Sequence, residues 1–338
     1  MKLLVTGGSG FIGSTFIKSM LKSSDISSIL NIDLLSYASN TSLDNSLNSK
    51  KYSFSRIDIT KYDDLWEVMQ SFLPDRIMHF AAESHVDRSI SGAKNFIDTN
   101  ILGTYNLLEL SRELLNKGLL PKNFIFHHVS TDEVYGDLSP SDQPFTELSQ
   151  YKPSSPYSAS KAASDHLVRS WGRTYDLNYI ITNCSNNFGP FQHPEKFIPT
   201  VILRAIDKKN IPIYGDGSQI RDWLFVNDHV AALKMIAESN LINEVFNIGS
   251  SNEITNKDLS QMILNIMIED FGFNKTIREL VCHVTDRLGH DRRYSINSAK
   301  IKETIGWNPK AEFTEDLKLT VQWYIDNHSN IHKVFNGI

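Results

Sequence analysis

Two short segments carry residues whose types and spacing could do chemistry. In the first, Tyr157 and Lys161 are four residues apart, which puts both side chains on one face of a helix. An ammonium group beside a phenol favours the phenolate, so we expect Lys161 to lower the pKa of Tyr157 from its usual value of about 10. Such a phenolate can take the proton of a hydroxyl group while a hydride leaves the carbon that bears this hydroxyl. This spacing is also common by chance, and a surface tyrosine packed on a lysine stem is the alternative.

The second segment is Thr131-Asp132-Glu133, which follows the apolar run Asn123–Ser130. We predict that this run is a buried strand, and ligands of open α/β sheets bind beyond the carboxyl ends of the strands. Two adjacent carboxylates in that position are costly unless they are used or paired. The alternative is that they cap the next segment, but a cap needs one acid rather than two. The triplet therefore indicates acid–base chemistry.

A glycine-rich loop near the start of the chain joins a predicted strand to a predicted helix, with glycines at 7, 10 and 13. Glycines allow a tight turn there and let backbone N–H groups approach a pyrophosphate at the helix N-terminus. Asp33 ends the next predicted strand 20 residues after Gly13, the spacing expected of a carboxylate that binds the adenosine ribose. Residues 34–40 contain no basic side chain that could bind the 2′-phosphate of NADP, which favours NAD as the cofactor. Asp58 would flank the adenine, with a turn cap as its alternative.

Short apolar runs alternate with helical patterns through the first half of the chain. The predicted strands are Lys2–Thr6, Ser28–Asp33, Tyr52–Arg56, Arg76–Ala81, Asn123–Ser130, Tyr179–Asn183 and Glu244–Gly249, and the predicted helices are Phe11–Lys22, Asp63–Phe72, Asn95–Lys117 and Tyr157–Tyr175. This alternation predicts an α/β protein with a Rossmann-type, doubly wound parallel sheet and a smaller, mostly α C-terminal lobe. We expect residues 1–183 and about 222–249 to form the dinucleotide-binding domain, and about 184–221 and 250–338 to form the lobe.

Composition narrows the function classes. The 338 residues are 41% hydrophobic and 22% charged, with a net charge of −5, which excludes a disordered chain and gives no electrostatic footprint for nucleic acid. The two cysteines, Cys184 and Cys282, form no C-x-x-C pair, which is typical of a reducing cytoplasm rather than a disulfide scaffold. No apolar run is long enough for a membrane span, and no signal peptide precedes the first predicted strand. The histidines lack ligand-like spacing, so we expect no metal site.

With these motifs in place, the chain resembles the extended short-chain dehydrogenase/reductase superfamily, and within it the nucleotide-sugar 4,6-dehydratases of the dTDP-glucose type. The resemblance covers nearly the whole chain. The segments that carry it are Thr6–Gly13, Ala81–Ser89, Ser130–Gly136, Pro153–Lys161, Asn183–Pro190, Arg221–Trp223 and Asp286–Tyr294. The Thr-Asp-Glu triplet is the most discriminating, because related 4-epimerases and decarboxylases usually lack the full Asp-Glu pair.

The resemblance implies an NAD-dependent hydro-lyase that converts a nucleoside-diphosphate glucose, with dTDP-glucose as the first choice, into the 4-keto-6-deoxy sugar. Tyr157, supported by Lys161, would take the proton of the sugar 4-hydroxyl while Thr131 hydrogen-bonds the 4-oxygen. After C4 is oxidised, Glu133 would remove the C5 proton. Asp132 would then protonate the departing 6-hydroxyl, the stored hydride would return to C6, and C5 would be reprotonated.

The resemblance also implies two sets of binding residues. The cofactor set is Gly7, Gly10, Phe11, Ile12, Gly13, Asp33, Leu34, Ser36, Asp58, Ile59, Ala81, Ala82, Ser84, Thr99, Tyr157, Lys161 and Asn187. The substrate set is Ser84, Thr131, Asn186, Lys196, Pro212, Tyr214, Arg221, Asn256, Arg287 and His290. Leu288 stands where the family usually has proline, which leaves the nucleotide preference more open than the reaction type.

Several alternatives stay open at this point. On the same scaffold they are a UDP-glucose 4,6-dehydratase and a UDP-sugar 4-epimerase or decarboxylase. From another class, a non-catalytic NAD-binding regulatory module is possible, although intact Thr131, Tyr157 and Lys161 argue against it. The resemblance implies a homodimer that pairs the helices Asn95–Lys117 and Tyr157–Tyr175 into a four-helix bundle, in the cytoplasm, with neither nucleic acid nor membrane as partner.

Overall fold

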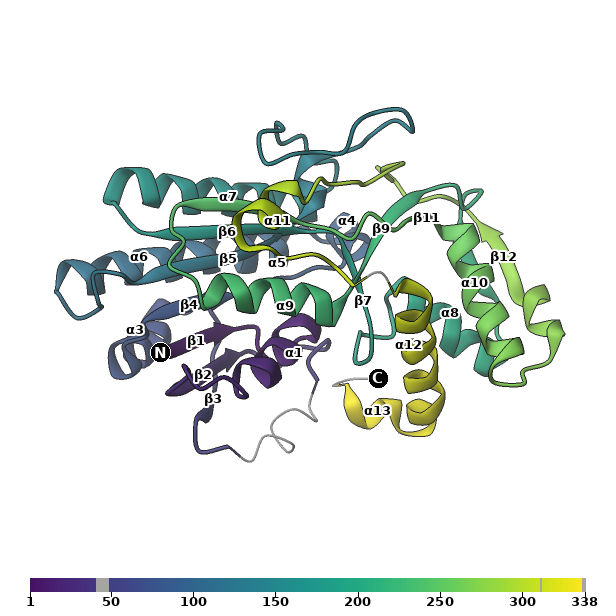
Figure 1. Cartoon of the computed structure of the whole chain (residues 1–338), viewed down its shortest axis with the longest axis horizontal. Coiled ribbons are helices and arrows are strands. Elements are labelled where there is room, and N and C mark those ends of the chain that lie inside the picture. The colour runs from purple at the N-terminus through teal and green to yellow at the C-terminus, as the bar shows by residue number, and fades with distance from the viewer. Residues whose placement is uncertain (41–48, 311, 336–338) are drawn as a thin grey trace.

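The centre of the molecule is a parallel sheet of seven strands (Figure 1). The computed structural model describes residues 1–40, 49–310 and 312–335. The strands lie in the order β10-β6-β5-β4-β1-β2-β3. Their bounds are β1 (Lys2–Thr6), β2 (Ser28–Asp33), β3 (Tyr52–Arg56), β4 (Arg76–His79), β5 (Ile125–Thr131), β6 (Tyr179–Cys184) and β10 (Glu244–Ile248). The order reverses between β1 and β4, where doubly wound sheets bind their ligands. The predicted fold class is confirmed.

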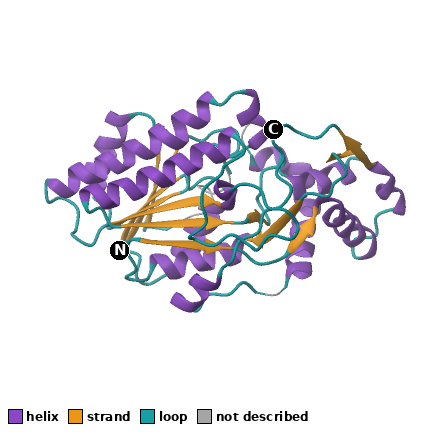
Figure 2. Cartoon of the chain, turned by 90° about the horizontal axis from the view of Figure 1, so that it is seen from above, coloured by secondary structure: helices purple, strands orange, loops and turns teal. Residues whose placement is uncertain are grey.

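Helices cover both faces of this sheet (Figure 2). One face carries α1 (Phe11–Met20) and α9 (Val226–Ala237), and the other carries α3 (Tyr62–Phe72), α6 (Thr104–Asn116) and α7 (Pro156–Tyr175). Side chains alternate between the two faces along each strand, so Leu3 and Val5 pack into one core while Leu4 packs into the other. Burial of both faces explains why these strands read as continuous apolar runs.

The segment predicted as one helix over Asn95–Lys117 has three parts. It begins as α5 (Lys94–Phe96), widens into a π-helical segment (Ile97–Gly103) and continues as α6. Asn100 lies in the wide part, where its side-chain amide grips the backbone of Glu83: Glu83 N donates to Oδ1 at 2.8 Å, and Nδ2 donates to Glu83 O at 3.0 Å. The π-helical segment thereby fixes the loop that follows β4 and leads to α4 (Val86–Ser91).

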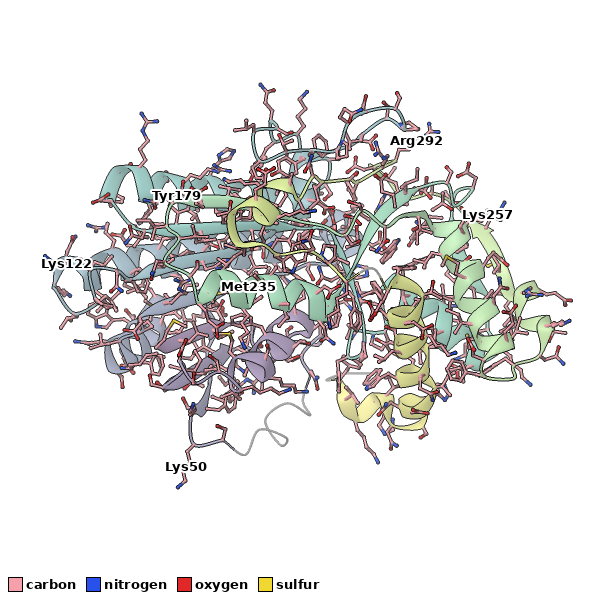
Figure 3. The ribbon with its side chains drawn as sticks, viewed as in Figure 1. Lys50, Lys122, Tyr179, Met235, Lys257 and Arg292 are labelled. Carbon is pink, nitrogen blue, oxygen red and sulfur yellow. The ribbon has the colours of Figure 1, made fainter. Side chains whose placement is uncertain are left out.

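The remaining elements form a second lobe beyond the carboxyl ends of the strands. Its helices are α8 (Phe197–Ile206), α10 (Asn256–Glu269), α12 (Phe313–Asn327) and α13 (Ile331–Val334), while α11 (Ala299–Ile305) packs beside β10. Two small sheets, β11-β9-β7 and β12-β8, complete it, with bounds β7 (Asn186–Phe188), β8 (Ile211–Tyr214), β9 (Ile220–Phe225), β11 (Glu253–Thr255) and β12 (Val281–Val284). Figure 3 shows Lys122, just before β5, at one end of the molecule and Lys257, on α10, at the other.

The short strands of this lobe were missing from the sequence prediction. Each has between three and six residues, too few for an alternating pattern to stand out, and Pro212 interrupts β8. Strand β9 pairs with β7 and β11 in one of the small sheets. After it, α9 leads the chain back to the large sheet, where it continues as β10. No helix of the described residues is long and apolar enough to cross a membrane.

The first glycine of the loop after β1 cannot be replaced without strain. Gly7 has φ +69°, and a Cβ built on it would lie 2.5 Å from the backbone nitrogen of Ala81. Gly13 is also required, since its Cβ would lie 2.4 Å from the carbonyl oxygen of Gly7. The backbone after β1 therefore passes against the backbone after β4, at the switch point of the sheet.

We predict that Gly7→Ala lowers the free energy of unfolding by about 3 kcal/mol or more, because it adds a backbone clash to the strained dihedral. Gly118→Ala is the matched control, since Gly118 has φ +68° but nothing lies within 4 Å of its Cβ position. We expect it to cost about 1–2 kcal/mol. Urea unfolding followed by circular dichroism measures both, and equal losses would contradict the close approach at Gly7.

Candidate active site

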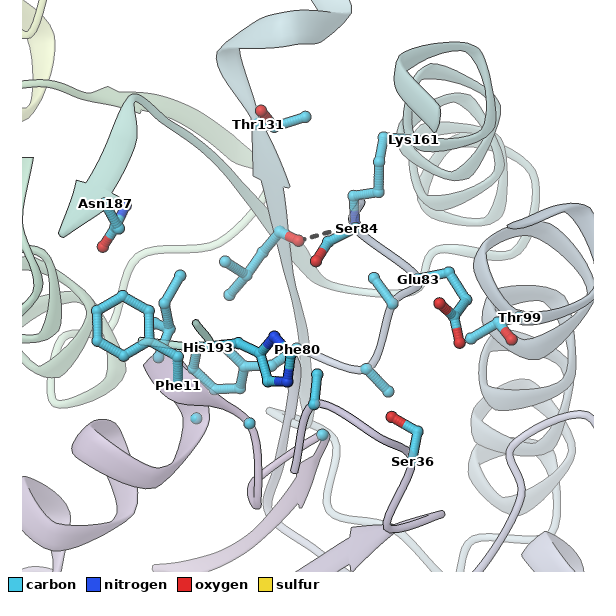
Figure 4. Close-up of a pocket in the computed structure, with 18 of the residues that line it drawn as sticks. Phe11, Ser36, Phe80, Glu83, Ser84, Thr99, Thr131, Lys161, Asn187 and His193 are labelled. Carbon is cyan, nitrogen blue, oxygen red and sulfur yellow. Dashed lines mark hydrogen bonds between the residues drawn. The ribbon is translucent and has the colours of Figure 1, made fainter. Parts of the chain in front are cut away.

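A cleft opens at the carboxyl ends of β1, β2, β4 and β5 (Figure 4). Every residue of the predicted cofactor set lines it, together with Thr131, Asp132 and Glu133. Asn187, from β7, and Thr99, from the π-helical segment, lie on opposite sides. The structure thus brings together, in one space, residues that are up to 180 positions apart in the sequence.

The start of α1 fits a pyrophosphate. Gly10 is its N-cap residue, with no side-chain cap, and no acidic residue lies in the first turn. Such an end presents unsatisfied N–H groups and the positive end of the helix dipole. At the end of β2, Asp33 accepts hydrogen bonds from the backbone nitrogens of Ser9 at 3.0 Å and Leu35 at 2.8 Å, which fix its carboxylate at the cleft. This donor set matches the adenosine diphosphate half of a dinucleotide.

Two neighbouring positions refine the sequence prediction. Asp58 both lines the cleft and caps a turn, because its Oδ1 accepts a hydrogen bond from Thr60 N at 2.9 Å. A basic residue does lie near this segment: Arg56 comes from β3 and donates from Nε to Leu34 O at 3.1 Å. Strand pairing places Arg56 beside Asp33, a contact that spacing along the chain does not indicate.

In this structure the pKa of Tyr157 is raised, where its spacing from Lys161 predicted a fall. Burial, followed by the charge of Glu133, raises the pKa of Tyr157 well above its usual value, with the Thr131 hydroxyl opposing the rise. Lys161 Nζ donates instead to Val129 O at 2.9 Å, the bond dashed in Figure 4, and lies 3.2 Å from Nε2 of His128. Burial also lowers the pKa of Lys161 to about 8. Desolvation therefore outweighs the attraction that the four-residue spacing suggests.

The two acids at the end of β5 have different environments. Asp132 is 2% exposed, and its Oδ2 finds no hydrogen-bond partner among the described residues. Burial, followed by the charge of Glu133, raises the pKa of Asp132 well above its usual value. Burial also raises the pKa of Glu133, but nearby cations oppose it, namely Arg287, Arg221 and Lys196. Burial therefore favours the protonated form of both acids, and nearby cations oppose it more strongly for Glu133, which is the kind of difference that separates an acid from a base.

The alternative of a simple cap does not hold for these acids. Thr131 is the residue that caps the short 3₁₀ turn Asp132–Tyr135, since its Oγ1 accepts a hydrogen bond from Glu133 N at 3.3 Å. Neither carboxyl group is therefore needed as the cap of this turn.

The predicted substrate residues divide into two groups. Ser84, Thr131, Asn186 and Lys196 line the cleft, whereas Pro212, Tyr214, Arg221, Asn256, Arg287 and His290 lie on the second lobe outside its lining. Tyr214 donates to Asp87 Oδ2 at 3.2 Å, and Arg287 Nη1 lies 3.4 Å from Asp87 Oδ1, so this carboxylate joins the two lobes. Arg221 is buried and donates to the carbonyl oxygen of Asp291 at 2.9 Å.

A cluster around Glu195 was not predicted from the sequence. Its carboxylate accepts from Tyr37 Oη at 2.8 Å, pairs with Arg88 Nε at 3.3 Å, and has His85 and His193 within 3.7 Å. The Arg88 guanidinium also lies 3.7 Å above the Tyr37 ring. Glu195 and His193 line the cleft, so this Glu195 cluster ties three distant segments of the chain together at its wall. No sequence motif predicts this cluster, because Tyr37 and Glu195 are 158 positions apart.

Comparison with known proteins identifies the family. A family model described as GDP-mannose 4,6 dehydratase matches residues 4–320. A curated dTDP-glucose 4,6-dehydratase of Salmonella typhimurium is 47% identical over 348 aligned residues, which cover 100% of this chain and 96% of that protein. This chain belongs to the nucleotide-sugar 4,6-dehydratase family. Among the described residues of this dehydratase, no group of three or more His, Cys, Asp and Glu side chains is placed to hold a metal ion.

Solved structures agree with the family but show that the fold is shared more widely. DesIV, a dTDP-glucose 4,6-dehydratase from Streptomyces venezuelae with NAD and TYD bound, matches with a TM-score of 0.89 and 38% identity, over 97% of this chain and 98% of that one. A UDP-glucose 4-epimerase from Thermotoga maritima matches with a TM-score of 0.84 and 28% identity, over 97% of this chain and 100% of that one. The backbone alone therefore does not separate dehydratases from epimerases.

We predict that Glu195→Gln speeds the loss of NAD about tenfold, because it weakens one charge-assisted contact at the wall of the cleft. NAD that remains after timed gel filtration measures the effect. Glu238→Gln is the control: Glu238, at the end of α9, accepts a hydrogen bond from Ser23 Oγ at 2.7 Å and does not line the cleft. Retention equal to that of the unmodified protein would contradict a role for the Glu195 cluster in holding the wall of the cleft.

Proposed function

We propose that this protein is an NAD-dependent dTDP-glucose 4,6-dehydratase, which converts dTDP-glucose into water and the dTDP-linked 4-keto-6-deoxy sugar. The observation that carries the proposal is the Asp132–Glu133 pair: Asp132 is buried and Glu133 partly buried, in the same cleft as Tyr157 and the glycine loop. Loss of water across C5–C6 needs an acid and a base at once, whereas 4-epimerisation does not. The identity of 47% to a dTDP-glucose 4,6-dehydratase over the full chain supports the same reaction.

We assign the cleft beside α1 and β2 to NAD. The glycine loop would hold its pyrophosphate, and Asp33 would hold the ribose hydroxyls. NAD, when bound, supplies the hydride acceptor for C4, the hydride donor for C6 and a positive charge in the cleft. Asn187 is already oriented for a contact there, because its Oδ1 pairs with His229 Nδ1 at 2.8 Å and its Nδ2 donates to Ser185 O at 2.9 Å.

The first proton transfer is assigned to Tyr157, which takes the proton of the sugar 4-hydroxyl. Because burial raises the pKa of Tyr157, this role requires positive charge in the loaded site, and Lys161 is the chain's own contribution. Thr131 has a hydroxyl placed to hydrogen-bond the 4-oxygen beside Tyr157.

The elimination is assigned to the two acids. Asp132 keeps its proton through burial and donates it to the departing 6-hydroxyl, which leaves as water. Glu133 takes the proton from C5, which the 4-ketone has made acidic. Its neighbours Arg287, Arg221 and Lys196 favour the ionised form that this step needs. The acid and the base are thus consecutive residues, and their different surroundings give their carboxyl groups different pKa values.

The second lobe, about 184–221 and 250–338, is assigned to the nucleoside diphosphate. Lys196, Arg221 and Arg287 would face the diphosphate, since a fixed guanidinium fork suits phosphate oxygens. Asn186, Asn256 and His290 would complete the contacts, and the β8 residues Pro212 and Tyr214 would border the base. Arg287 would have to exchange its contact with Asp87 for the substrate.

We also propose a homodimer and a cytoplasmic location. Apolar side chains are exposed along the π-helical segment, α6 and α7, namely Ile97 at 52%, Leu102 at 44%, Tyr105 at 38% and Tyr175 at 48%. A four-helix bundle with a second copy would cover them, and sedimentation velocity should give twice the monomer mass. Both cysteines are free thiols, which suits a reducing compartment.

The direct test of the reaction is mass spectrometry of sugar nucleotides after incubation with the protein and NAD. We expect dTDP-glucose to lose one water and, in deuterated water, to gain solvent deuterium at C5. UDP-glucose is run in parallel, and preferential turnover of it would assign a UDP-glucose 4,6-dehydratase. Unchanged mass with both nucleotides would overturn the proposal and favour epimerase chemistry or a binding role.

We predict a bell-shaped pH profile for kcat/KM with dTDP-glucose. Glu133 must be ionised, so activity falls as the pH drops through its pKa, which lies above the ordinary value of 4.5. Asp132 must be protonated, so activity falls again as the pH rises through its own raised pKa. An acid limb at or below pH 4.5 would rule out the proposed environment of Glu133.

We predict that Tyr157→Phe lowers turnover by at least about a thousandfold, since it removes the proton acceptor for C4 oxidation. Folding and NAD binding should stay nearly unchanged, because the lost hydroxyl makes no contact that the fold needs. Circular dichroism and NAD titration are the controls. Surviving turnover would show that Tyr157 is not the base.

A further inference from the structure

A third residue extends the Tyr157–Lys161 stripe of α7 by one more turn. Asp165 follows Lys161 at the same four-residue spacing, so all three side chains share one face of the helix. Asp165 is completely buried, and Lys161 is 3% exposed. A carboxylate is costly in such a place unless other groups pair with it.

One imidazole lies between Asp165 and Lys161. His128, from β5, has its Nε2 atom 3.2 Å from Lys161 Nζ and 3.3 Å from Asp165 Oδ1. The other oxygen, Oδ2, accepts from Tyr151 Oη at 2.8 Å and from Asn183 Nδ2 at 3.2 Å. Oδ2 of Asp165 is therefore hydrogen-bonded, and Oδ1 faces the imidazole nitrogen that also contacts Lys161.

We propose that Asp165 is a positioning residue: its buried carboxylate is the counter-charge that keeps Lys161 charged and directed at the cleft, with His128 as the spacer between them. This inference rests on the proposed function, because it gives Lys161 its role beside Tyr157. Asp165 lines no part of the cleft and acts through Lys161.

The charges of the three groups support this arrangement. Burial alone would raise the pKa of Asp165, but the His128 imidazole beside it and the charge of Lys161 bring it below its usual value. Burial, followed by the charge of Lys161, lowers the pKa of His128 to about 4, which leaves it neutral near pH 7. Burial lowers the pKa of Lys161 to about 8, and Asp165 is the first group that opposes this fall.

Other titratable groups around these residues do not supply the same charge. Those that face Lys161 or Asp165 from neighbouring elements are His79 on β4, Cys184 on β6, Tyr135 after β5, Tyr151 before α7 and Arg169 on α7. Burial lowers the pKa of His79 and raises that of Cys184, so both are neutral near pH 7. Asp165 is thus the anion of this set at that pH.

The test isolates the step that needs Lys161. In an Asp132→Asn/Glu133→Gln background the proposed elimination is removed, and NADH absorbance after mixing with dTDP-glucose reports C4 oxidation alone. We expect the rate to fall on the alkaline side as Lys161 loses its proton. Asp165→Asn in this background should move that alkaline edge to lower pH by about one unit or more. The reason is that Lys161 loses the nearby negative charge that favours its protonated form.

Tyr151→Phe tests the same carboxylate with the opposite sign. It removes a donor that partly neutralises Asp165 and leaves the charge in place, so the edge should move to higher pH. Asp228→Asn is the matched control: Asp228 is a 6% exposed aspartate on α9 that accepts a hydrogen bond from Lys310 N at 2.9 Å, and its replacement should leave the edge where it is.

The outcomes separate this inference from the proposed function. Absence of NADH in the background variant, with no turnover by the unmodified protein, would overturn the proposed function and this inference with it. NADH formation with an unmoved edge in folded Asp165→Asn would overturn the inference alone. Should that variant fail to fold, Tyr151→Phe decides: an edge at higher pH supports the counter-charge, and an unmoved edge overturns it.

Discussion

The cost of burying two adjacent carboxyl groups at the end of β5 is the constraint on which the site depends. Asp132 and Glu133 lie where water is largely excluded, so both are pushed toward their neutral forms. The second lobe opposes this effect more for Glu133 than for Asp132: Arg287 and Arg221 both lower the pKa of Glu133, whereas only Arg221 acts on Asp132. An acid and a base on consecutive residues therefore need both lobes in place.

The parallel sheet supplies the frame for this arrangement. Its carboxyl edge brings the glycine loop after β1, Asp33 at the end of β2 and Thr131 at the end of β5 to one cleft. The close approach of Gly7 to Ala81 keeps the glycine loop against the loop after β4. Asn100, in the π-helical segment, binds the same loop through a hydrogen bond from Glu83 N. Helix α7 then contributes Tyr157 and Lys161 from one face, with Asp165 behind them.

Much of this could be predicted from the sequence, and the exceptions have physical reasons. Strand–helix alternation and the glycine spacing are local patterns, so the sheet and the cofactor cleft followed from them. The sign of the pKa shift of Tyr157 did not, because burial is a property of the whole fold and outweighs the nearby Lys161. The Glu195 cluster joins segments that share no pattern. The lobe's small strands are too short to carry a periodic signal.

We propose that Asp132 holds a proton at neutral pH beside an ionised Glu133. Infrared difference spectroscopy between the unmodified protein and Asp132→Asn at pH 7 measures this most directly. The account predicts that a protonated carboxyl band is present in the unmodified protein and disappears in the variant. A difference spectrum that contains carboxylate bands in place of the protonated carboxyl band would contradict it.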